Sequence, residues 1–96
     1  MRRKDVMEQL KANVSRFSEF NIKSLAVFGS VARGEARPDS DVDILVEFNG
    51  PATFDQYMEL KIFLEDLLSR PVDLVTRQGV RPELAPYIEQ EARCVA

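Results

Sequence analysis

The first apolar pattern of the chain has a helical period. Between Lys4 and Phe20, apolar residues recur at three- and four-residue spacing, which places them on one side of an α-helix. The members of this stripe are Val6, Leu10, Val14 and Phe17. We therefore predict one helix over this segment that ends near Asn21, with the stripe packed in the core and the charged residues in solvent.

Short apolar runs further along the chain are typical of buried strands. They cover residues 24–28, 41–48 and 72–76, and each is bounded by glycine, proline or polar residues. Residues 93–95 are expected to add a short edge strand. Residues 35–40 contain Pro38 and polar residues and are predicted to form a loop.

Two more helices are indicated by their first turns. Thr53-Phe54-Asp55-Gln56 matches a capping box, which predicts a helix that runs to about Ser69. Pro82 suits the first turn of a helix that runs to about Glu91. The apolar sides of these helices are expected to contain Phe54, Tyr57, Met58, Leu60, Leu64, Leu67 and Leu68, and then Leu84, Ala85 and Ile88.

The order of these elements predicts an α/β fold in one domain, residues 1–96, with helices packed on a small sheet of about three to four strands. The length of 96 residues allows one modest core. Tyr57 is expected to pack in that core, and contact with a bound nucleotide is the alternative.

Composition narrows the classes of function. The net charge of −3 disfavours a protein that coats nucleic acid with a basic surface, and no run is apolar enough to span a membrane. A single cysteine, Cys94, cannot form an internal disulfide, which fits the cytoplasm. Without histidine, zinc sites and histidine-based triads have few candidates.

The candidate chemistry lies around a glycine-serine turn and two acids. Gly29 allows a sharp turn after the first strand, and Ser30 begins a short helical piece whose free amides favour an anion such as phosphate. Asp41 and Asp43 share one side of the next strand, because alternate strand residues point the same way. Two adjacent carboxylates repel each other unless a cation or a proton lies between them. Mg²⁺ is commonly held by carboxylates and substrate phosphates, so this stretch predicts a metal–nucleoside triphosphate site.

Asp73 is a third acid, within the apolar strand 72–76. A buried carboxylate needs a partner. One interpretation is a structural salt bridge with Arg77 or Arg81, and the other places Asp73 beside the acid pair around the metal. Two interpretations of Arg33 are kept: contact with a phosphate, or a position on the surface. Arg37 is interpreted as a surface residue.

The string GSVARGEARPDSDVDILV, with Gly29-Ser30 ten residues before Asp41-Val42-Asp43, resembles the signature of the polymerase-β-type nucleotidyltransferase superfamily. It is similar to the minimal nucleotidyltransferases, the MNT antitoxins of HEPN/MNT toxin–antitoxin pairs. This resemblance covers most of the chain and implies a mixed sheet with the active site at its open face.

The resemblance also implies a reaction. An Mg²⁺-dependent enzyme, with two ions, would move AMP from ATP onto a tyrosine hydroxyl of a cognate HEPN toxin. Asp41, Asp43 and Asp73 would be the catalytic and metal-binding residues, and Gly29, Ser30 and Arg33 would bind the nucleotide. The expected partners are ATP, the toxin and a homo- or hetero-oligomer, since a chain this short offers no separate domain for the acceptor. The alternatives are an antitoxin that acts only by forming a complex, and a transferase for an aminoglycoside-like small molecule.

Overall fold

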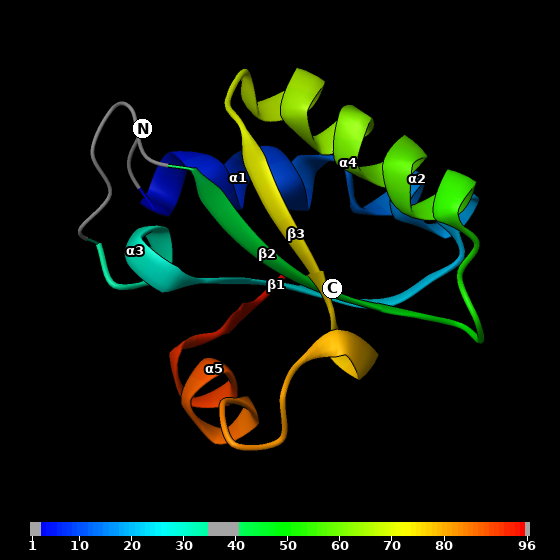
Figure 1. Ribbon diagram of the computed structural model, residues 1–96. Coiled ribbons are helices and arrows are strands. Elements are labelled where there is room, and N and C mark those ends of the chain that lie inside the picture. Colours follow the sequence, from blue (N-terminus) through cyan, green and yellow to red (C-terminus); the bar gives the residue numbers. More distant parts are fainter. Residues whose placement is uncertain (1–2, 35–40, 96) are drawn as a thin grey trace.

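A four-stranded mixed sheet organises the computed structural model, which describes residues 3–34 and 41–95 (Figure 1). The strand order is β3-β2-β1-β4. The strands are β1 (Ile22–Phe28), β2 (Val42–Phe48), β3 (Val72–Thr76) and β4 (Arg93–Cys94). β1 pairs with β2 and β4 in antiparallel orientation, whereas β2 and β3 are parallel. The predicted α/β class and the mixed sheet are confirmed, and the predicted loop over 35–40, with Arg37, lies outside the described residues.

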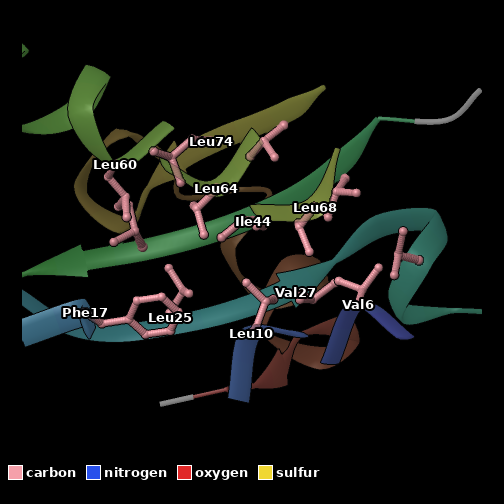
Figure 2. Packing of buried hydrophobic residues seen from close by; sticks show 14 of the residues in the cluster. Val6, Leu10, Phe17, Leu25, Val27, Ile44, Leu60, Leu64, Leu68 and Leu74 are labelled. Carbon is pink, nitrogen blue, oxygen red and sulfur yellow. The ribbon is translucent and has the colours of Figure 1, made fainter. Parts of the chain in front are cut away.

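One face of the sheet forms the hydrophobic core. Helices α1 (Arg3–Ala12), α2 (Val14–Phe17) and α4 (Phe54–Leu68) cover this face (Figure 1). Figure 2 shows apolar side chains from these helices, among them Leu10, Phe17 and Leu64, meeting those of β1, β2 and β3. Because side chains alternate along β2, Val42, Ile44 and Val46 enter this core and Asp43 and Leu45 face the opposite side.

The opposite face of the sheet carries the acids and is covered in part. Helix α5 (Ala85–Glu91) and the 3₁₀ helix η2 (Arg77–Gly79) lie on this side (Figure 1). Leu45 is buried there in a small hollow that Val80 and Ile88 also line. The acids therefore lie beside an apolar contact between the sheet and α5.

The N-terminal helix differs from the prediction of one continuous helix. It is interrupted at Asn13, whose side chain donates a hydrogen bond to the Gln9 carbonyl at 2.9 Å, and a 3₁₀ turn η1 (Ser18–Phe20) completes the segment. This bond competes with helical backbone pairing. The break rotates Val14 out of the stripe, so Val14 is 37% exposed. Asn21 ends the segment as predicted, in the left-handed conformation with φ 59°.

The capping box of α4 is confirmed. The Thr53 hydroxyl accepts from the Gln56 backbone N–H at 3.1 Å, and the Gln56 side chain accepts from the Thr53 N–H at 3.0 Å. The helix ends at Leu68, before Ser69 in the left-handed conformation. Phe54 was expected on the apolar side but is 76% exposed, because it lies at the first helical position, beyond the edge of the core.

Helix α5 begins three residues later than predicted. Residues 82–84 form a turn in which the Leu84 and Ala85 amides bond to the Arg81 carbonyl. Pro86, rather than Pro82, occupies the first turn of the helix, where its missing N–H is not needed. Leu84 remains exposed, whereas Ala85 and Ile88 are half-buried. Within residues 3–34 and 41–95, no helix is long and apolar enough to cross a membrane.

Two aliphatic residues of α4 provide a test of this packing. Leu64 is fully buried and Ile62 is 52% exposed on the same helix. Leu64→Ala should lower the free energy of unfolding by about 3 kcal/mol, because it leaves a cavity in the core. Ile62→Ala should cost less than about 1 kcal/mol. Urea unfolding of both variants measures the difference, and equal losses would contradict the assigned orientation of α4.

Candidate active site

Asp43 and Asp73 lie side by side on the face of the sheet opposite the core. β2 and β3 run parallel, and their register pairs Asp43 directly with Asp73. The two carboxyl groups are therefore neighbours, and the charge of Asp73 acts on the titration of Asp43. The strand register therefore places these two acids side by side, as predicted.

The environment of Asp43 favours its protonated form. Burial of the half-buried side chain and the neighbouring charge of Asp73 raise the pKa of Asp43 from 3.8 to about 6. The hydrogen bond with Asp73 and the charge of Asp41 act in the same direction, and the positive charge of Arg33 opposes them. A perturbed carboxyl group of this kind is characteristic of functional sites.

Asp41 stands one residue before β2 and is exposed. Its charge reaches Asp43, so the acid pair of the sequence is near in space. In the part of the chain that the structure describes, no three His, Cys, Asp or Glu side chains are grouped closely enough to hold a metal ion. The expected convergence of all three aspartates is therefore not formed, and Asp43 and Asp73 are the pair that the fold brings into contact.

Gly29 lies directly against the Asp43 side chain. It follows β1 with φ +71°, a conformation that residues with a side chain rarely adopt. A Cβ atom at this position would overlap Oδ2 of Asp43. The glycine was predicted from the need for a turn near a ligand, and in the structure it also leaves the space that the Asp43 carboxyl group occupies.

The short helix α3 (Gly29–Ala32) starts at this turn, as predicted. Phe28 precedes it in extended conformation and has no side-chain acceptor for the first amides of the helix. Ser30 is half-buried at the second helical position. The turn therefore places the start of α3 beside the Asp43 carboxyl group.

Arg33 ends α3 and belongs to the surroundings of the site. Its guanidinium forms an ion pair with Glu91 of α5 at 2.9 Å, and its charge lowers the pKa of Asp43. Sequence reasoning missed Glu91, because 58 residues separate it from Arg33 and no local motif relates them. Any phosphate that Arg33 contacts would compete with Glu91 for its N–H donors.

The structure bears on two alternatives for residues near the site. Arg77 pairs with Glu89 of α5 at 2.5 Å, and Asp73 is exposed and lies in register beside Asp43, whereas its place around a metal stays a prediction. The premise that Asp73 is buried in its strand was wrong, because only alternate residues of β3 face the core. Tyr57 packs against the core, and its hydroxyl donates to the Leu74 carbonyl, so the core interpretation of Tyr57 is the correct one.

The donor set fits a hard divalent cation. Asp43 and Asp73 offer only oxygen atoms, and a cation bound beside them would relieve the repulsion between their charges. Mg²⁺ is typically held by one or two carboxylates together with substrate phosphates, so a complete cage of protein ligands is not required.

The conserved sequence pattern of the nucleotidyltransferase domain matches residues 6–95, nearly the whole chain. The chain belongs to the nucleotidyltransferase family. The resemblance inferred from the glycine-serine turn and the two acids is confirmed, and so is the assignment of the chain as an enzyme of this class.

Relatives of this nucleotidyltransferase are similar over most of their length. It is 42% identical over 72 residues to the protein adenylyltransferase MntA of Thermococcus cleftensis, covering 75% of this chain and 73% of that protein. A solved structure of a candidate minimal nucleotidyltransferase superimposes with a TM-score of 0.85 at 39% identity, covering 97% of this chain and 95% of the other.

A more distant solved structure shares the fold. It contains a tri-AMPylated HEPN toxin of Shewanella oneidensis in complex with an MNT antitoxin. The matched chain superimposes with a TM-score of 0.69 at 17% identity. The match covers 94% of this chain and 71% of the matched chain.

The contact between Gly29 and Asp43 can be tested with a matched glycine. Gly34 has nearly the same φ, +75°, but a Cβ atom there would meet no atom of the described residues within 4 Å. Gly34→Ala should cost about 1 kcal/mol of unfolding free energy from backbone strain alone. Gly29→Ala should cost about 2 kcal/mol more and reduce nucleotide transfer, because its methyl group displaces the Asp43 carboxyl group. Urea unfolding and a transfer assay measure both effects, and equal behaviour of the two variants would contradict this contact.

The raised pKa of Asp43 predicts a pH-dependent stability. Between pH 3.8 and about 6 the folded state binds more protons than the unfolded state, so stability falls as pH rises through this window. Asp43→Asn removes the charge and should stabilise the protein at pH 8, relative to wild type, by about 1 kcal/mol more than at pH 3.5, after allowance for solvent screening.

This comparison uses urea unfolding in EDTA at both pH values. Asp66→Asn, at an exposed position of α4, is the control for an aspartate outside the site. A difference between Asp43→Asn and wild type that is the same at pH 3.5 and pH 8 would show that Asp43 titrates alike in the folded and unfolded states.

Proposed function

We propose that this nucleotidyltransferase is an Mg²⁺-dependent protein adenylyltransferase that moves AMP from ATP onto a tyrosine hydroxyl of a HEPN-type toxin. In this role it acts in the cytoplasm as the antitoxin of that partner. The identity with the protein adenylyltransferase MntA supports the type of reaction. The solved complex of an AMPylated HEPN toxin with an MNT antitoxin supports the class of partner, through the shared fold.

The observation that carries this proposal is the Asp43–Asp73 pair against the Gly29 turn. Two carboxyl groups in contact, one with a pKa of about 6, form a site that gains from binding a cation. The turn beside them offers amides to phosphate oxygens. A cation and a polyphosphate are the two components of a metal–ATP complex.

Each residue has a distinct role in this mechanism. Asp43 and Asp73, together with Asp41, would hold Mg²⁺. The bound metal would neutralise the triphosphate and lower the pKa of the attacking hydroxyl. Gly29 and Ser30 would bind the terminal phosphates, and Arg33 would add a charged donor after release from Glu91.

The transfer itself forms one bond and breaks another. The tyrosine oxygen attacks the α-phosphorus of ATP, and the bond from that phosphorus to the pyrophosphate oxygen breaks. The Asp73 carboxylate would receive the hydroxyl proton, and pyrophosphate leaves with the electron pair of the broken bond. Positioning and neutralisation of charge supply most of the catalysis in such a site.

The direct test incubates the protein with ATP labelled at the α-phosphate, Mg²⁺ and a HEPN-type partner protein. Label should appear on the partner, and mass spectrometry should locate AMP on a tyrosine. The variant with Asp41→Ala and Asp43→Ala should transfer at least about 100-fold more slowly, because the metal–ATP complex is no longer held.

Asp66→Ala is the matched control, since Asp66 is an exposed acid of α4 outside the site. Label with α-labelled but not γ-labelled ATP would identify nucleotidyl transfer rather than phosphorylation. An unlabelled partner that is still neutralised by the double variant would contradict the catalytic role and leave inhibition by complex formation.

A further inference from the structure

Two side chains of α4 bond the backbone of β3 on either side of Asp73. The Glu65 carboxylate accepts a hydrogen bond from the Val72 N–H at 2.9 Å. The Tyr57 hydroxyl donates to the Leu74 carbonyl. Val72 and Leu74 are the chain neighbours of Asp73, so the two bonds bracket the residue that contacts Asp43.

These bonds use backbone groups that the sheet leaves free. β3 is an edge strand with β2 as its strand neighbour on one side. The Pro71 carbonyl accepts from the Val42 N–H, so alternation along β3 directs the backbone groups of residues 71, 73 and 75 toward β2. The N–H and C=O groups of Val72 and Leu74 therefore point to the outer side, where an edge strand otherwise relies on water or another chain.

The geometry of α4 suits this arrangement. Tyr57 and Glu65 are eight residues apart, about two helical turns, so they lie near the same side of the helix and about 12 Å apart along its axis. Tyr57, nearer the start of α4, reaches Leu74 in the middle of β3, and Glu65 reaches Val72 at its beginning. The helix thus runs opposite to the strand and fixes it at two points.

We infer that Tyr57 and Glu65 are positioning residues that hold Asp73 in register with Asp43. This inference rests on the proposed role of Asp73 at the metal–nucleotide site. The carboxyl groups of Asp73 and Asp43 repel each other whenever both are charged, and an edge strand with ladder bonds on one side is poorly restrained against that force. Bonds from α4 on the other side oppose the displacement of β3.

The first measurement is hydrogen exchange of the Val72 amide in the protein without metal. Glu65→Ala should accelerate this exchange by about tenfold, because the amide loses its acceptor. Glu65→Gln keeps an oxygen acceptor and should retain most of the protection. Thr53→Ala is the matched control: it removes the cap of the same helix, costs about 1 kcal/mol of stability and removes a bond to Gln56 within α4 rather than a bond to β3.

The second measurement is the affinity for Mn²⁺ in the presence of a non-hydrolysable ATP analogue, from the electron paramagnetic resonance signal of free Mn²⁺. Glu65→Ala and Tyr57→Phe should each weaken binding by about tenfold, as loss of a supporting residue behind a metal ligand commonly does. Glu65→Gln should bind within about threefold of wild type, and Thr53→Ala should bind as wild type does.

Asp73→Asn separates failure of this inference from failure of the proposed function. If Asp73→Asn weakens Mn²⁺ binding but Glu65→Ala and Tyr57→Phe do not, the positioning role is overturned and the site stands. If Thr53→Ala weakens binding as much as Glu65→Ala, the bonds contribute only to stability and the inference is again overturned. If Asp73→Asn binds Mn²⁺ as tightly as wild type, Asp73 is not part of the metal site, and the positioning role is overturned as well.

Discussion

The contact between two carboxyl groups on neighbouring parallel strands is the constraint on which the rest of this protein depends. The register of β2 and β3 sets Asp73 against Asp43, and the pKa of Asp43 rises in consequence. Such a contact destabilises the folded chain at neutral pH unless a cation or a proton is present. Stability given up at one place is a common feature of functional sites, because the same strain favours the bound ligand.

The remainder of the fold keeps this contact in place. On one face, leucine and valine residues of α1 and α4 close the core against β1, β2 and β3 (Figure 2). On the other, α5 covers Leu45 and is tied by the Arg33–Glu91 and Arg77–Glu89 ion pairs. These pairs are largely exposed, so each contributes little free energy. On that second face Asp43 is half-buried and Asp73 is exposed.

Much of this arrangement could be predicted from the sequence, because its determinants are local. The capping box at Thr53, the alternation around Asp73 and the glycine at position 29 each act through neighbouring residues. The break at Asn13 and the late start of α5 depended instead on competing bonds between side chain and backbone or within a turn. Other contacts join segments that are distant in the sequence, and no spacing predicts them. They are the pairing of Arg33 with Glu91 and the bonds from Tyr57 and Glu65 to β3.

The alternation of β3 also bears on how the chain finds its native strand pairing. A shift of β3 by one residue along β2 would turn Asp73 inward beneath α4 and bring Val72 and Leu74 out into solvent. An unpaired carboxylate in that apolar layer is far costlier than the same group at the surface. Asp73 therefore also disfavours the shifted strand register during folding, because a misaligned sheet would have to bury its carboxylate.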